Sequence, residues 1–241
     1  MADPNGTFAK IRASIAHLGV RVFVLLAFRT AIERLTAGRI RVTAYRFVAQ
    51  PVASQADAPA SRRGSIETRF AGIDDPLVAQ FPRPRAVIER RFADGAVCIV
   101  AHKEHRFAGF LWLQTPRYVE DEVRCVYEME PAGAAAWDFD VYVEPHFRFG
   151  KTFVRLWDAA RAHLRQRGLA WTMSRISLFK PESLRAHERL GAQRLGDALF
   201  FSGKRHQIVL FNLPPYFHAG GPGSSPMLRL KAPNEVPLRH R

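Results

Sequence analysis

The chain has 241 residues, of which 47% are hydrophobic and 24% are charged. This composition is ordinary for a globular protein and excludes a chain that is mainly disordered. The 36 Lys and Arg outnumber the 22 Asp and Glu, which gives a formal charge of +14. Such a surface attracts anions, namely nucleic acid, acidic lipids, phosphorylated cofactors or an acidic carrier protein, and the charge alone does not choose among them.

Residues 1–40 carry a helical pattern of apolar side chains between basic ones. The apolar residues recur mostly every three or four positions: Ile11, Ile15, Leu18, Val22, Leu25, Ile32 and Leu35. The longest apolar run, residues 22–28, is too short to cross a bilayer, which takes about 20 residues. The pattern predicts a basic amphipathic helix that either lies on an anionic membrane surface or packs against the domain or another chain.

The expected localisation is cytoplasmic, with peripheral membrane attachment through residues 1–40 as the alternative. Cys98 and Cys125 match no metal or redox spacing, so we expect two reduced core thiols. Basic residues interrupt the start of the chain, which does not fit a secretory signal peptide.

From residue 41 the pattern changes to that of an α/β domain. Residues 41–50 are rich in β-forming side chains and predict a strand, whereas residues 51–65 predict a loop. Residues 66–93 predict two short helices that are interrupted near Pro82 and Pro84. The first part of the domain is therefore expected to contain one strand followed by helices.

A hairpin and a central strand follow. Residues 96–102 and 107–113 are apolar runs joined by a charged turn, which indicates an antiparallel hairpin. Residues 123–129 either extend the sheet or lie in a loop. Residues 137–143 alternate, which predicts a strand with Trp137, Phe139, Val141 and Val143 on one face and Asp138, Asp140 and Tyr142 on the other.

The last predicted elements alternate between helix and strand. They are a helix carrying Phe153, Leu156, Trp157, Ala160 and Leu164 on one face, a strand at 169–178, a helix at 181–191, and strands at 198–202 and 207–212. Residues 214–241 are rich in proline and predict a loosely held tail. The sequence thus predicts a basic helical extension at 1–40, one mixed α/β domain at 41–213 and a C-terminal tail at 214–241.

The strand at 137–143 leads through a tight turn into the next helix. A helix that begins after such a turn leaves its first amides unpaired, and its dipole favours anions there. Arg148, Gly150 and Lys151 occupy the turn. The segment is therefore expected to bind phosphate, as many strand–turn–helix units do.

Two motifs in this region resemble those of the GNAT acyltransferases. Residues 143–157 are similar to the acetyl-CoA motif Val-x-Pro-x-x-Arg, which precedes a Gly-x-Gly turn and a helix, through Val143, Pro145 and Arg148. Residues 180–192 are similar to the family's second motif through Ser183, Leu190 and Gly191. The resemblance implies a GNAT-like mixed central sheet with a strand–phosphate loop–helix core, and an acyl-coenzyme A substrate.

The resemblance also implies the residues that bind acetyl-CoA or another acyl-CoA. They are Val141, Val143, Arg148, Gly150, Lys151, Thr152 and Ser183. Lys151 and Phe153 replace the family glycines of the phosphate turn, so Lys151 is expected to bind phosphate by its side chain and Phe153 to turn into the core. Lys180 and His187 replace the family's Asn and Tyr.

The implied chemistry is direct attack of a neutral amine on the thioester. His187 is the candidate acid for the departing thiolate, because histidine titrates near neutral pH; the alternative is a core histidine bonded to backbone. Asp140 and then Asp138 are the candidate bases, with Glu128 and Glu130 as further choices. The alternative for each carboxylate is simple solvation.

The acceptor is expected to be an amine of a small molecule or sugar. An acidic acyl carrier protein is the alternative donor, and a non-catalytic binding or regulatory module is the alternative function. The histidines offer no metal set, so no metal is expected. The Arg62–Arg63 and Arg90–Arg91 pairs are interpreted as solvated charge, and no interleaved aromatic motif supports nucleic acid as a partner.

Overall fold

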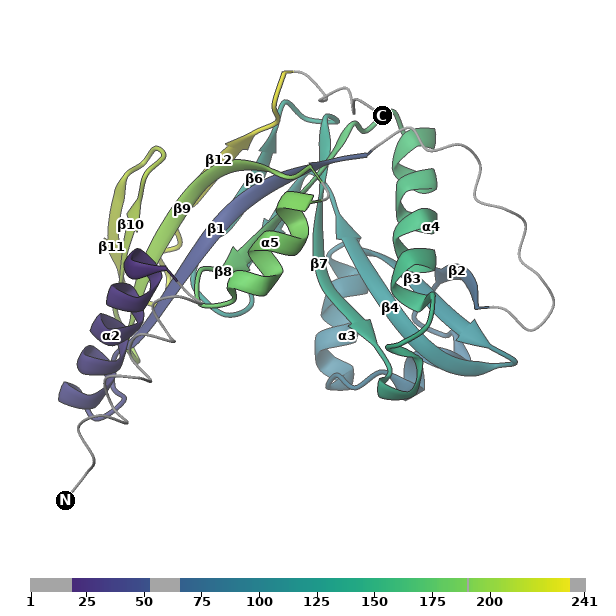
Figure 1. The fold of residues 1–241 in the computed structure, drawn as a ribbon, viewed down its shortest axis with the longest axis horizontal. Coiled ribbons are helices and arrows are strands. Elements are labelled where there is room, and N and C mark those ends of the chain that lie inside the picture. The colour runs from purple at the N-terminus through teal and green to yellow at the C-terminus, as the bar shows by residue number, and fades with distance from the viewer. Residues whose placement is uncertain (1–18, 53–65, 190, 235–241) are drawn as a thin grey trace. The chain divides into compact units, whose positions relative to one another are not determined.

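The computed structural model describes residues 19–52, 66–189 and 191–234 (Figure 1). The first part of the predicted amphipathic helix, the loop at 53–65 and Leu190 lie outside these residues. The chain divides into two compact units. Unit 1 comprises the described residues of Met1–Gln50, Val119–Tyr127 and Arg175–Arg229, and unit 2 those of Pro51–Tyr118, Glu128–Ser174 and Leu230–Arg241.

Unit 1 contains an antiparallel set of strands and two helices. Its elements are α2 (Val20–Leu35), β1 (Arg41–Pro51), α5 (Pro181–Arg189), β9 (Gln193–Ser202), β10 (Gln207–Phe211) and β11 (Phe217–Gly220). The strands lie in the order β11-β10-β9-β1, and each neighbouring pair is antiparallel. The Thr30 hydroxyl in α2 donates a hydrogen bond to the carbonyl of Leu26 at 2.8 Å, so this hydroxyl has its partner within the helix.

Unit 2 is built on a mixed set of strands. Its elements are β2 (Glu67–Ala71), η1 (Pro76–Gln80), α3 (Arg85–Ala93), β3 (Val97–Lys103), β4 (Arg106–Gln114), β7 (Ala135–Val143), η2 (Pro145–Phe147), α4 (Thr152–Gln166) and most of β8 (Trp171–Ser177). The strand order is β8-β7-β4-β3-β2, with β7 and β8 parallel and the other pairs antiparallel. The helix α4 is the crossover between the two parallel strands, as a parallel pair requires.

Three short strands form a second sheet in the order β12-β6-β5. They are β5 (Arg117–Val119), β6 (Val126–Glu130) and β12 (Met227–Lys231), and each has residues in both units. Two of the strands, β11 and β12, come from residues that the sequence predicted to be a loose tail. Their runs of four and five residues, separated by prolines, are too short to show a clear alternation.

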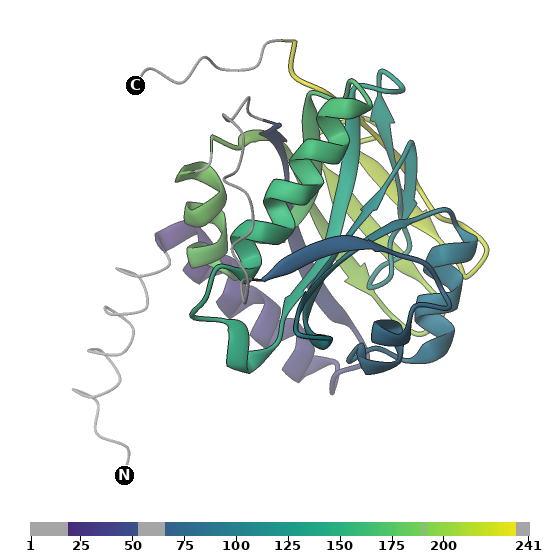
Figure 2. The ribbon, with the colours of Figure 1, turned by 90° about the vertical axis from the view of Figure 1, so that its right-hand side faces the viewer.

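The helix α4 packs on one face of the unit 2 strands (Figures 1 and 2). Its buried side chains are Leu156, Trp157, Ala160 and Leu164, and they share a core with Ile99, Leu111, Leu113 and Ala136 from the strands. The opposite face carries aromatic rings instead, where Trp112 contacts Phe81, which follows η1, and Phe92 of α3. Burial of both faces fixes the register of β4 and therefore the position of its neighbour β7.

The predicted mixed α/β class is confirmed, and most elements occur where the sequence placed them. Two corrections concern unit 2. Residues 67–71 form β2 rather than helix, because they pair with β3 along its edge. Phe153 was expected in the core, but its side chain is 47% exposed.

Cys98 and Cys125 are buried free thiols, as predicted, and burial raises the pKa of both. In the part of the chain that the structure describes, no helix combines the length and apolarity needed to cross a membrane.

Candidate functional site

The turn between β7 and α4 ends in an open helix N-terminus. The helix begins at Thr152, and Lys151 precedes it without a side-chain cap. Among the described residues, the amides of Thr152, Phe153 and Val154 have no backbone acceptor. These donors and the helix dipole favour an anion at this end of α4.

Two cationic residues precede these amides in the turn. Arg148 and Lys151 are exposed, and the Arg148 Nε atom donates to the carbonyl of Val143 at 3.2 Å. The first turn of α4 contains no acidic residue. Gly150 is exposed, and a Cβ added to it would meet only the Phe147 carbonyl oxygen at 3.4 Å, so the turn is not crowded. The local charge is therefore positive and accessible.

Two phenylalanines flank the turn without closing it. Phe149 is fully exposed, and Phe153 is half-exposed with its ring 6.3 Å from that of Trp157. The expectation that Phe153 turns into the core is wrong because Trp157, one turn further along α4, fills that place. The exposed rings leave an apolar rim beside the cations.

The remaining candidates of this segment differ in accessibility. Thr152 is fully buried, and its Oγ1 atom has no hydrogen-bond partner among the described residues. Val141 and Val143 are half-buried and pack against the core beneath α4, so a ligand would meet their backbone rather than their side chains. The parallel ladder with β8 covers Ala135–Trp137, while the ladder with β4 continues to Val143.

A β-bulge interrupts β7. Phe110 of β4 pairs with Tyr142, whereas Trp112 pairs with Phe139, so the single residue between them faces both Asp140 and Val141. Asp140 has a φ of 47°, in the left-handed region that few non-glycine residues adopt. The bulge breaks the alternation from which the sequence placed Asp138 and Asp140 on one face.

Two arginines hold the carboxylate of Asp140. Arg83 donates to both of its oxygens, with a distance of 2.8 Å from Nε to Oδ2. Arg91 donates to the same Oδ2 from Nη1 at 2.6 Å, and its guanidinium lies over the rings of Trp112 and Phe139. The two guanidinium groups therefore occupy both oxygens of the Asp140 carboxylate, which leaves these oxygens little room to contact a substrate amine. We call these three residues the Asp140 clamp.

Arg91 was interpreted from the sequence as solvated charge, which is wrong. Its side chain is 10% exposed. Arg90, the other member of that pair, is exposed. Arg91 lies three residues after the buried Ile88, so the helical spacing already placed it on the inner face of α3.

Asp138 has a different environment from Asp140. Its carboxyl is buried beside the hydroxyls of Thr172 and Ser174 on β8. Burial raises the pKa of Asp138 from 3.8 to about 7, against the opposing effect of the two hydroxyls. The prediction that Asp138 and Asp140 share a face is therefore wrong, and Asp138 is the carboxyl whose pKa is raised by burial.

Ser183 and His187 belong to unit 1, on α5. The His187 Nδ1 atom lies 3.1 Å from the side-chain oxygen of Gln50, and burial lowers the pKa of His187. The Ser183 amide donates to the carbonyl of Lys180 at 3.1 Å in the first turn of the helix. His187 thus has a side-chain partner rather than the backbone partner considered in the sequence.

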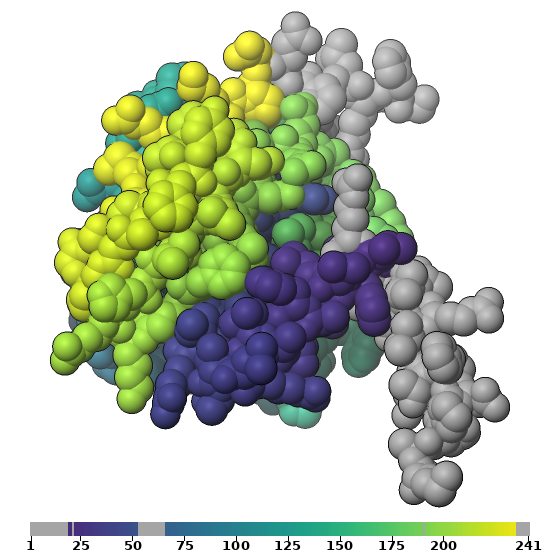
Figure 3. Space-filling model, turned by 90° about the vertical axis from the view of Figure 1, so that its left-hand side faces the viewer, coloured from purple at the N-terminus to yellow at the C-terminus, as the bar shows by residue number. Residues whose placement is uncertain are grey.

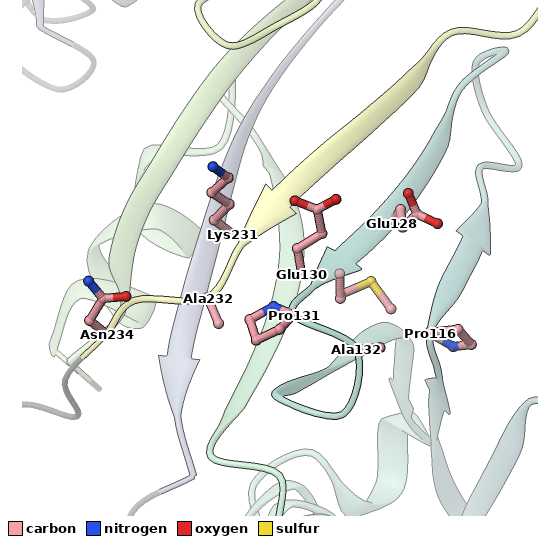
Figure 4. A pocket seen from close by; sticks show the side chains of 9 residues that line it. Pro116, Glu128, Glu130, Pro131, Ala132, Lys231, Ala232 and Asn234 are labelled. Atoms are coloured by element: carbon pink, nitrogen blue, oxygen red, sulfur yellow. The ribbon is translucent and has the colours of Figure 1, made fainter.

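Glu128 and Glu130 line a pocket of their own (Figure 4). The pocket has a volume of about 570 Å³ and also includes Lys231 and Asn234 from the C-terminal segment. Both glutamates lie on the same face of β6, while Tyr127 and Met129 on the other face are buried. The pocket combines two carboxylates with one ammonium group in an open setting.

Unit 1 contains a buried ionic network that the sequence did not reveal. Arg175 binds both oxygens of the fully buried Glu120, at 2.5 and 2.7 Å, and its guanidinium lies 4.2 Å from the ring centre of Tyr45. Tyr45 in turn donates to Glu122. These contacts join the loop after β5 to β1 and β8, and loss of one partner would leave a buried charge unpaired, so we assign the network a structural role.

No family model matches this chain, and no curated protein matches its sequence. Solved structures that share part of its fold include an acetyltransferase of the GNAT family from Novosphingobium aromaticivorans, described as putative, with 19% identity and a TM-score of 0.46. That alignment covers 66% of this chain and 63% of the other, so the chain spans less than two thirds of this neighbour.

Two further neighbours have comparable scores. A conserved protein of unknown function from Staphylococcus epidermidis shares 11% identity with a TM-score of 0.45, over 75% of this chain and 66% of that one. A glucosamine N-acetyltransferase region of a fungal multi-domain β-N-acetylglucosaminidase shares 14% identity with a TM-score of 0.46, over 70% and 22%.

Proposed function

We propose that this protein transfers an acyl group from a coenzyme A thioester to an amine of a small molecule or sugar. The observation that carries this proposal is the open N-terminus of α4 directly after β7. Its unpaired amides at Thr152, Phe153 and Val154 and the cations of Arg148 and Lys151 fit a diphosphate group. The exposed Phe149 and Phe153 would lie beside the arm that links this diphosphate to the thioester.

The departures from the GNAT motif are compatible with this substrate. Lys151 stands where a family glycine lets the backbone approach the phosphate, and its exposed ammonium supplies charge instead. Phe153 stands at a second glycine position, but its half-exposed ring leaves the helix mouth open. We therefore assign phosphate binding to Arg148, Lys151 and the amides of the first turn.

Asp138 is the residue that we assign as general base. The amine nitrogen attacks the thioester carbonyl carbon, its proton passes to the Asp138 carboxylate, and the carbon–sulfur bond breaks to release a thiolate that takes up a proton. A base with a pKa of about 7 is partly ionised at neutral pH and still strong enough to accept the proton. Asp140 is reassigned from base to positioning residue because the clamp arginines occupy its oxygens.

The resemblance also carries the acid role to His187, and this assignment stays a prediction. Burial lowers the pKa of His187, so its protonated form becomes scarce above its ordinary value of 6.5. A histidine that only holds Gln50 would leave turnover unchanged when replaced by Asn, which is the result that would end the acid assignment. An acyl carrier protein as donor and a non-catalytic binding module are the competing readings.

Calorimetric titration of the full chain with acetyl-CoA tests the binding step. Arg148→Ala should weaken binding about tenfold, since a charge-assisted hydrogen bond contributes roughly 1.5 kcal/mol. Arg167→Ala is the matched control, because Arg167 is an exposed arginine at the opposite end of the same helix. Equal affinities in the two variants, or no binding of any coenzyme A thioester, would refute the proposal.

The pH dependence of turnover tests the assignment of the base. With Asp138 as base, the rate should rise with pH and level off above about pH 7, because only the ionised carboxylate accepts a proton. Asp138→Asn should remove both the activity and this inflection while leaving acetyl-CoA affinity unchanged. An inflection near pH 7 that persists in Asp138→Asn would exclude Asp138 from the chemistry.

A further inference from the structure

The helix α2 exposes an apolar stripe to solvent. Val20, Val24, Ala27, Ala31 and Leu35 follow each other at three- and four-residue spacing and are all exposed, with Val20 at 63% and Leu35 at 84%. The opposite side of the helix is also apolar, and its side chains are half-buried. A helix with apolar residues on both sides has an outer face that water solvates poorly.

The strands next to α2 extend this apolar surface. In antiparallel pairs, residues directly opposite project to the same side, so Ile208 lies beside Phe201, and Leu210 lies beside Phe217. Ile208, Leu210 and Phe217 are each more than two fifths exposed. The ring of Phe28 on α2 contacts that of Phe201 at 6.1 Å and thereby connects the helix with the strands.

Figure 3 shows α2 and the strand pair β10–β11 on the same face of the molecule, and the ring contact between Phe28 and Phe201 joins α2 to the neighbouring strand β9. We define the α2 surface by its exposed apolar residues of unit 1: Val20, Val24, Phe28, Leu35, Ile208, Leu210 and Phe217. Isolated exposed apolar residues need no explanation, but a set that is continuous over a helix and two strands marks a contact surface.

Basic side chains border one end of the α2 surface. Arg34, Arg39, Lys204 and Arg205 are exposed, and none of them forms an ion pair with any described residue. The turn that holds Lys204 and Arg205 approaches Arg39, whose carbonyl lies 3.7 Å from the position of a Cβ on Gly203. Four cations thus gather near the end of α2.

The nearby acids do not cancel these cations. Glu33 is paired with Arg29, and Asp197 is paired with Arg46 and Arg194. Apolar side chains bordered by unneutralised cations complement an anionic lipid surface, where acyl chains meet the apolar residues and headgroups meet the cations. A second copy of the chain fits less well, because a two-fold contact would bring the same cations against each other.

We propose that the α2 surface docks on an anionic membrane, with α2 lying in the plane of the headgroups. Arg34 lies next to Leu35 in the last turn of α2, at the basic end of the apolar stripe. We therefore expect the helix to insert its apolar face into the headgroup region and to lie parallel to the membrane plane. The proposal does not depend on acyl transfer, since it rests on residues of unit 1 outside the β7–α4 turn.

Vesicle sedimentation with the full chain tests the apolar contribution. The wild type should pellet with vesicles of phosphatidylcholine and phosphatidylglycerol and stay in solution with phosphatidylcholine alone. Combined Val20→Ser, Val24→Ser and Leu35→Ser should abolish pelleting, because these side chains lose their apolar contact with lipid. Val119→Ser with Phe70→Ser is the control, since both side chains are more than half exposed and lie outside the α2 surface and the β7–α4 turn.

The charge contribution is tested in the same assay. Arg34→Gln with Arg39→Gln should weaken partitioning roughly thirtyfold. Arg106→Gln with Arg167→Gln removes two exposed arginines elsewhere and should have a much smaller effect. The proposal is overturned if the wild type does not bind anionic vesicles, or if the serine variant binds them as well as the wild type does. It is also overturned if light scattering shows a dimer of the wild type that is absent in the serine variant, while neither form binds vesicles. The vesicle assay contains no thioester, so its result tests membrane docking independently of acyl transfer.

Discussion

Replacing Asp138 by Asn should change how stability depends on pH. The folded protein holds the Asp138 proton up to about pH 7, whereas the unfolded chain loses it near the ordinary value of 3.8. Between these values the folded state binds more protons than the unfolded state, so stability falls as pH rises. This contribution is fully present below 3.8 and is lost through about pH 7.

The magnitude follows from the size of the pKa shift. Raising the pKa of Asp138 from 3.8 to about 7 spans roughly three units, and each unit corresponds to about 1.4 kcal/mol, so the loss amounts to at most about 4 kcal/mol. Asparagine has nearly the same shape and carries no charge at any pH. The stability of Asp138→Asn relative to the wild type should therefore increase by up to this amount from acidic to alkaline pH.

Urea denaturation across this pH range, followed by tryptophan fluorescence, measures the difference. Asp74→Asn is the control, because Asp74 is exposed and its replacement should shift the curve by a constant amount. Parallel pH profiles for the wild type and Asp138→Asn would show that the carboxyl is not buried as described, and would also remove the reason for assigning it as the base.

Two further predictions concern the surroundings of β7. Gly109→Ala should destabilise unit 2 by about 1–3 kcal/mol, because the added Cβ would lie 2.4 Å from the carbonyl oxygen of Tyr142. Gly150→Ala should cost much less, because its Cβ would meet only one atom, at 3.4 Å. Thermal denaturation of both variants measures the difference, and equal effects would contradict the prediction. Arg91→Met should cost about 3 kcal/mol by leaving the Asp140 carboxylate with one cation, and a double-mutant cycle with Asp140→Asn should recover part of the loss; additive effects would contradict the clamp.

Local patterns in the sequence were sufficient to predict the β7–α4 segment. The alternation around Trp137 and the stripe from Leu156 to Leu164 reflect burial on one face, and burial is what determines strand and helix in this region. The cations of the turn were also predictable, because they are neighbours in the chain. The predicted strand, turn and helix therefore coincide with β7, the turn after it and α4, whereas the anion site itself stays a prediction.

The failures arise where distant segments meet. The helical spacing places Arg91 on the inner face of α3, but its partner Asp140 lies 49 positions later, and no local pattern contains that pairing. The bulge at Asp140 was invisible for a similar reason, since it is defined by the register with β4. The raised pKa of Asp138 depends on its burial beside Thr172 and Ser174 on the next strand.

The bulge also determines how tolerant β7 is of insertion and deletion. The extra residue of the bulge inverts the alternation of side chains between the two faces of the sheet. The orientation of Val143 and of the turn after it therefore depends on the number of residues in β7, and not on any single side chain. Deletion of one residue at the bulge would turn the side chains that follow it to the opposite face of the sheet. The start of α4 would then be reoriented, although every amino acid around Arg148 is retained. Relatives of this protein that lack the extra residue would need a turn of different length to present the same amides.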